Sequence, residues 1–150
     1  MSASSARKWI ELNWLRKGNK EIPLPNLIYH NLPDCSGMYY PRQKDECCVG
    51  SSYYDLTDRA LICVAENNCD EFGDFEEILA HEWRHHLQRQ RYKFQGVIFD
   101  NSGDYKENII SYFMDNWHEL DAFMFSWSKI ETRATTIWFE WLREAGVIKC

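Results

Sequence analysis

The chain has 150 residues, of which 45% are hydrophobic and 15% aromatic. This composition excludes a disordered or fibrous chain and predicts a packed core, and the length fits one domain over residues 1–150. The formal net charge of −6 argues against nucleic acid as the primary partner. Residues 1–20 lack the apolar core of a signal peptide, and no stretch approaches the roughly 18 apolar residues of a membrane span. We therefore expect a cytoplasmic protein with no membrane partner.

The first half of the chain predicts mixed, irregular structure. Apolar residues at helical spacing favour a short helix over residues 5–17. All four prolines fall in the segment that follows, so we expect extended chain there with strand fragments at residues 27–29 and 38–40. Residues 44–58 are polar and indicate a loop. The apolar run at residues 60–65, rich in β-formers, predicts the clearest strand.

The second half predicts mainly helices. After an acidic turn, Asp74 is a suitable N-cap with Glu77 three residues later, and the helix that it starts should run to about Arg91. Residues 97–99 could form a short strand. Further helices are expected over residues 106–114, 118–128 and 131–144. The predicted fold class is α+β, with a short mixed or antiparallel sheet packed on the helix that starts at Asp74.

That central helix contains the pattern His-Glu-x-x-His at His81-Glu82-Trp83-Arg84-His85. Residues four apart lie one above the other on a helix face, so His81 and His85 can bind one metal ion. Glu82 lies one residue further round, where it can contact a water on that ion without being a ligand. The arrangement is typical of a zinc-dependent hydrolase, in which zinc activates the water and Glu82 takes its proton.

A catalytic zinc ion usually has a third protein ligand. The extended motif with a third histidine fails, because Gln88 stands where glycine is needed and Arg91 where histidine is needed. We favour Glu119, on the predicted helix over residues 118–128. Ala122 and Ser126 share its side of that helix, and their small size would allow a close approach to the histidines.

Other carboxylates are alternatives. Asp121 lies about 160° from Glu119 on the same helical wheel, so both cannot point at one metal ion. Asp100 and Asp104, in the preceding loop, are further candidates. Asp115 could accept a hydrogen bond from a ligand histidine.

The positions of several other polar residues suggest roles outside the metal-ligand set. Three residues could stabilise an oxyanion, and the sequence does not choose among them: Tyr105, Tyr112 and His118. His86 is turned about 100° from His85, which indicates a surface or packing residue rather than a metal ligand. A basic group at the end of the central helix should oppose the helix dipole rather than bind phosphate: Arg84, Arg89, Arg91 and Lys93.

The six cysteines form no C-x-x-C pair, and adjacent Cys47 and Cys48 are poorly placed for a mutual disulfide. We expect reduced or buried thiols. Disulfides and a second, cysteine-rich zinc site are the alternatives, the latter because five cysteines lie between Cys35 and Cys69.

The pattern His81-Glu82-x-x-His85 followed by Glu119-x-x-Ala122 resembles the gluzincins, the HExxH zinc metallopeptidases whose third ligand is a glutamate. It is most similar to the small minimal forms found in bacterial, phage and plasmid proteins. The resemblance covers about residues 60–127. The chain departs from the commonest second motif, in which Asp or Asn follows the alanine.

The resemblance implies a small zincin-like domain in which a strand edge, here residues 60–65, precedes the active helix. It implies zinc ligands at His81, His85 and Glu119, with Glu82 as general base. Phe123 stands where the family commonly has Asp or Asn, so the residue supporting the ligands is open.

The expected function is zinc-dependent hydrolysis of peptide bonds in a protein or peptide substrate. The alternative is a non-catalytic protein of phage or plasmid type, in which the same zinc site is structural. Glu82 favours the enzyme, because a purely structural site needs no base.

Overall fold

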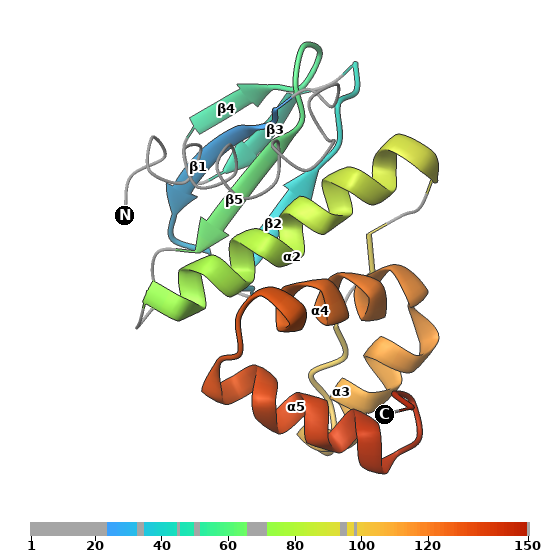
Figure 1. Cartoon of the computed structure of the whole chain (residues 1–150). Coiled ribbons are helices and arrows are strands. Elements are labelled where there is room, and N and C mark those ends of the chain that lie inside the picture. The colour runs from blue at the N-terminus through green and yellow to red at the C-terminus, as the bar shows by residue number, and fades with distance from the viewer. Residues whose placement is uncertain are drawn as a thin grey trace.

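The computed structural model describes residues 24–32, 35–44, 46–49, 52–65, 72–93, 96–97 and 99–149. Within these ranges the strands lie in the N-terminal half and four helices lie in the C-terminal half, which confirms the α+β class. Helix α2 (Phe72–Arg91) lies between the strands on one side and the other helices on the other (Figure 1). The helix predicted over residues 5–17 lies outside the described residues.

Three strands form the sheet that supports α2. The order is β1 (Asn26–His30), β5 (Leu61–Ala65), β2 (Gly37–Tyr40), with β1 parallel and β2 antiparallel to β5. All five residues of central strand β5 are buried, as expected for an apolar run with partners on both edges. The three strands predicted in this half are therefore confirmed.

The loop predicted over residues 44–58 is wrong. Strands β3 (Glu46–Val49) and β4 (Ser52–Asp55) pair antiparallel there, with Val49 opposite Ser52. This register leaves two residues between the strands, the shortest common hairpin connection. Local pairing of this kind outweighs the polar composition, which was the basis of the loop prediction.

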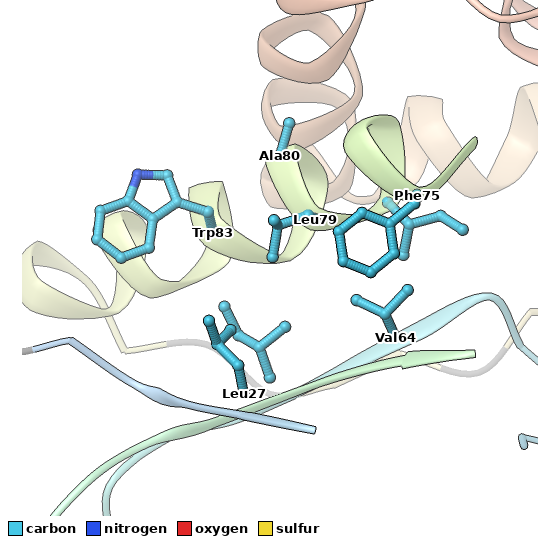
Figure 2. Packing of buried hydrophobic residues seen from close by; sticks show 8 residues of the cluster. Leu27, Val64, Phe75, Leu79, Ala80 and Trp83 are labelled. Atoms are coloured by element: carbon cyan, nitrogen blue, oxygen red, sulfur yellow. The ribbon is translucent and has the colours of Figure 1, made fainter. Parts of the chain in front are cut away.

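The two faces of the sheet are buried against different layers. Ile62 and Val64 of β5 belong to the core shared with α2, whereas Leu61 and Cys63 belong to the core that includes Val49 of the hairpin. Alternation along a strand places neighbouring residues on opposite faces, and here both faces are covered. Figure 2 shows side chains of the first core packed between the strands and α2.

Helix α2 ends at Arg91, as predicted, and carries basic residues in its last turn. Its start differs from the prediction. The helix begins at Phe72, so Asp74 lies inside the first turn and is not the N-cap. Because Gly73 is a poor helix former, the sequence favoured a start after it, whereas the helix includes it.

The remaining helices follow the predictions within three residues at each end. They are α3 (Tyr105–Asp115), α4 (Trp117–Lys129) and α5 (Arg133–Glu144). They share a third core, which includes Phe113, Phe123 and Leu142. The strand predicted over residues 97–99 is wrong where the structure describes it, since neither Val97 nor Phe99 is in a strand.

Helix α4 lies along α2 on the side opposite to the sheet (Figure 1). The approach is close because Ala122 and Ser126 of α4 are completely buried. The Ser126 hydroxyl donates a hydrogen bond of 3.3 Å to Glu77 Oε1 of α2. The small residues predicted to allow this contact therefore do so. No helix among the described residues is long and apolar enough to cross a membrane.

Candidate metal centre

Three of the predicted site residues meet where α2 faces α4. His81 Nε2 lies 3.0 Å from Glu119 Oε2 and 3.2 Å from His85 Nε2. His85 Nε2 lies 3.2 Å from Glu119 Oε1. The two histidines are one turn apart on α2, and Glu119 is in the first turn of α4.

These residues could hold a metal ion. The potential ligand atoms, one from each residue, all lie within 4.8 Å of one another. Two ligand atoms about 2.1 Å from a tetrahedral ion are about 3.4 Å apart, close to the separations that the side chains already have. Two imidazoles and a carboxylate also match the ligands of catalytic zinc sites, with one coordination position left over.

Glu119 and His81 strongly shift each other's pKa values. Burial opposes ionisation of Glu119, but hydrogen bonds and charge from His81 and His85 hold the pKa of its carboxyl well below the usual range. Burial likewise opposes protonation of His81. The hydrogen bond and charge of Glu119, with the charges of Glu82 and Glu77, outweigh that burial and raise the pKa of His81 to about 9. Without a metal, the cluster therefore favours a shared proton, which a bound cation would displace.

Glu82 is buried between the two histidines and the sheet. Only 7% of the residue is exposed. Burial raises the pKa of its carboxyl, although the charges of His85 and His81 work in the opposite direction. It is thus a carboxyl whose affinity for a proton exceeds that of an ordinary surface glutamate.

Strand β2 fixes the position of Glu82. A Cβ atom added at Gly37 would lie 2.7 Å from Ile78 Cγ2 and 3.1 Å from Glu82 Oε1. Only a glycine allows β2 to pass α2 this closely. The role of Gly37 could not be predicted from the sequence, because nothing local in the chain shows which helix this residue meets.

A hydrogen-bonded chain supports His85 from behind. His85 Nδ1 lies 2.9 Å from Gln88 Oε1, and Gln88 Nε2 donates to Asp121 Oδ2 at 2.8 Å. Arg84 in turn donates to both oxygens of Asp121, at 2.7 and 3.1 Å. Asp121 is therefore kept apart from the metal ligands, as the helical wheel indicated, and Gln88 occupies the role suggested for Asp115.

The contact of Gln88 with His85 was not predicted; in the sequence Gln88 only argues against the motif with a third histidine. Its position three residues after His85 was a usable signal, since residues three apart lie on the same helix face. The partner of its amide nitrogen could not be found in the same way, because it lies on another helix.

Of the three proposed oxyanion donors, the structure brings two to the cluster. Burial raises the pKa of Tyr112, and the charge of Glu119 and a hydrogen bond to it raise it further. His118 Nε2 lies 3.8 Å from Glu119 Oε1. Tyr105 is 55% exposed and packs against Phe99 and Trp141 instead, so it is excluded.

The other candidates serve local structure. Asp100 accepts hydrogen bonds from Ser102 in an exposed turn. Asp104 caps α3 by accepting from the backbone N–H of Glu107 at 3.0 Å. His86 is buried, with its Nδ1 2.8 Å from the Tyr39 hydroxyl, so of the two roles predicted for it, surface or packing, the structure shows packing.

The cysteines in the described residues lie in varied surroundings. Cys63 is a buried thiol, Cys35 is half-buried and Cys48 is exposed. Among the residues that the structure describes, no cysteine belongs to a group that could hold a metal ion. The side chains of Cys47, Cys69 and Cys150 lie outside the described set.

No protein-family model, curated protein or solved structure matches this chain.

Proposed function

We propose that the chain is a zinc-dependent peptidase of the gluzincin type, which hydrolyses peptide bonds in a protein or peptide substrate. The observation that carries the proposal is the meeting of Glu119 with His81 and His85. The sequence motif predicts this contact. The contact also requires α2 and α4 to pack in one particular register.

The ligands in this proposal are His81, His85 and Glu119. When bound, zinc would supply a Lewis acid that polarises the scissile carbonyl and lowers the pKa of water. A catalytic rather than a closed structural ion is favoured because the group found among the described residues has three ligands, which leave one position open.

Glu82 is the proposed general base. Its carboxylate takes the proton of the attacking water and then carries that proton to the leaving amine. Burial against Gly37 supports this role in two ways: it raises the proton affinity of the carboxyl and it restricts where the carboxyl can point.

Tyr112 is the proposed donor to the developing oxyanion. It is the candidate with a hydrogen bond to the ligand Glu119, and burial keeps its phenol protonated. A protonated phenol can donate to an oxygen that becomes negative during the reaction, and its single hydroxyl hydrogen would turn from Glu119 to that oxygen.

The test compares three glutamate variants on zinc content and hydrolysis. Purified without chelator, the unaltered protein should contain one zinc ion per chain and cleave members of a library of internally quenched peptides. Glu82→Gln should keep the zinc and lose roughly 100- to 10,000-fold in rate, since the base is gone but the ligands remain. Glu119→Gln should lose most of its zinc.

Glu76→Gln is the matched control, because Glu76 lies on the same helix and belongs to no metal-binding group. Both zinc content and hydrolysis should be unchanged in it. Absence of zinc from the unaltered protein would overturn the proposal. Stoichiometric zinc with no cleavage of any peptide would instead favour the structural alternative.

A further inference from the structure

We infer that Gln88 selects the tautomer of His85 that a metal ion requires, and that Asp121 and Arg84 hold Gln88 in the orientation that does so. The inference rests on the proposed metal site and adds a positioning residue to it. Gln88 is only 5% exposed, so water does not compete strongly for its amide.

The orientation of the Gln88 amide follows from its neighbours. Its Nε2 lies 2.8 Å from the backbone oxygen of His118 and 2.8 Å from Asp121 Oδ2. Both partners are acceptors only, and an amide NH2 group has two hydrogens to donate. If the amide were turned over, its oxygen would face two acceptors and both hydrogen bonds would be lost.

The tautomer of His85 follows from that orientation. The other end of the amide, Oε1, can only accept, and it lies 2.9 Å from His85 Nδ1. This contact therefore requires a hydrogen on Nδ1. In neutral His85 the lone pair is then on Nε2, and Nε2 carries a hydrogen toward Glu119 only when the imidazole is protonated. Nε2 is the atom that faces His81 and Glu119, so the imidazole presents its lone pair to the metal position.

Asp121 and Arg84 complete the arrangement. The guanidinium of Arg84 donates to both carboxylate oxygens, which fixes the plane of the Asp121 carboxylate. Asp121 Oδ2 then receives the Gln88 amide as well. Because Asp121 accepts from the Gln88 amide nitrogen, it keeps the Gln88 side chain from rotating its amide group by 180°.

This chain of contacts makes an unusual prediction for a carboxylate at position 88. Gln88→Glu keeps an acceptor for His85 Nδ1. If any acceptor at this position were enough to orient His85, the variant would bind zinc at least as tightly as the unaltered protein. If instead the amide must donate to the His118 carbonyl and to Asp121, zinc binding should weaken, because a carboxylate cannot donate to the His118 carbonyl and would face the Asp121 carboxylate.

The experiment measures zinc affinity and the tautomer of His85 separately. Zinc affinity is determined by competition with a chromophoric chelator. Gln88→Met, of similar size but without hydrogen-bonding groups, should bind zinc about 10- to 100-fold more weakly. Gln88→Glu should also bind more weakly. Gln90→Met is the matched control, since Gln90 is exposed on the same helix, and its affinity should be unchanged.

The tautomer is read from nitrogen–proton correlation spectra of the metal-free protein, at a pH where His85 is neutral. The unaltered protein should show hydrogen on Nδ1, and Gln88→Met should shift toward the other tautomer. Combining Gln88→Met with Asp121→Ala should weaken zinc binding no further than Gln88→Met alone, because Asp121 acts through Gln88.

Two results would overturn the inference: hydrogen on Nε2 in the unaltered protein, or Gln88→Glu binding zinc at least as tightly as the unaltered protein. Neither depends on hydrolysis. A protein that binds no zinc would end the proposed function, yet the tautomer of the metal-free protein would still decide the role of Gln88. If Gln88→Met is too unstable to purify, Gln88→Glu and Asp121→Ala supply the same comparisons.

Discussion

The two sides of α2 bury different kinds of side chain. Toward the sheet it presents Phe75, Leu79 and Trp83, all at most 4% exposed and packed against strand residues. Toward α4 it presents the two histidines with Arg84 and Gln88, which make hydrogen bonds and ion pairs with Glu119 and Asp121 or with one another. One face of α2 thus contributes mainly to stability through core packing, and the opposite face carries the candidate metal ligands.

The separation arises from the helical period. Residues three and four apart return to the same side, so Phe75, Leu79 and Trp83 form one stripe and His81, His85 and Gln88 another. A substitution on the first stripe should therefore change mainly the stability, and one on the second mainly the metal affinity. Three further experiments test that division, beginning with the largest expected effect.

Trp83→Ala should lower the free energy of unfolding by about 3–5 kcal/mol, since it leaves a large cavity in the core against the sheet. Zinc affinity of the folded protein should be unchanged. Urea unfolding and a zinc titration measure the two quantities. Ile137→Ala, at a 47% exposed position on α5, is the control and should cost less than about 0.5 kcal/mol. A loss of zinc affinity in folded Trp83→Ala would contradict the division.

The loss of stability at alkaline pH should come mainly from the α4 side. In the metal-free protein the raised pKa of His81 gives stability that is fully present below pH 6.5 and lost as the pH rises through about 9. The effect is about 3 kcal/mol at most. The lowered pKa of Glu119 adds a loss of stability at acid pH, below the usual range of glutamate.

Urea unfolding in chelator across this pH range measures the effect. Glu119→Gln should reduce the alkaline loss, because it removes the largest of the interactions that raise the pKa of His81 and leaves only the charges of Glu82 and Glu77. Saturating zinc should also remove it, since the metal binds the deprotonated imidazole. An alkaline loss that persists in full in Glu119→Gln would place its origin elsewhere in the protein.

Gly37→Ala tests a point where the sheet contacts the proposed base. The added Cβ would lie 2.7 Å from Ile78 Cγ2 and 3.0 Å from Glu82 Cγ, so we expect a cost of about 1–3 kcal/mol. Peptide hydrolysis should fall while zinc is retained, because Glu82 moves and the ligands do not. Gly96→Ala, where an added Cβ meets nothing within 4 Å, should alter neither property.

Local patterns were enough to predict the helices and the three strands of the main sheet. The run at residues 60–65 and the aromatic stripes of the last two helices repeat at the period of the structure that they form. The hairpin at Glu46–Val49 and Ser52–Asp55 was missed because most of its described side chains are exposed, and buried Val49 and half-buried Tyr54 do not form a regular alternating pattern.

In the candidate site, what could be predicted depended on distance along the chain. The spacing of His81 and His85 is a property of one helix, and Glu119 could be chosen by the small residues that share its side. The contact of Gly37 with Glu82 and that of Gln88 with Asp121 each join separate elements. No periodicity within either element contains that information.

The placement of the third ligand has a consequence for how the protein matures. Helix α2 alone holds two of the three groups, and Glu119 follows His81 by 38 residues, on a helix that belongs to the other core. During synthesis, a chain whose helical layer has not yet docked has no complete metal centre. Assembly of the proposed metal centre would then depend on the docking of α4 against α2, so a chain that still lacks α4 would offer an ion only two of the three ligands.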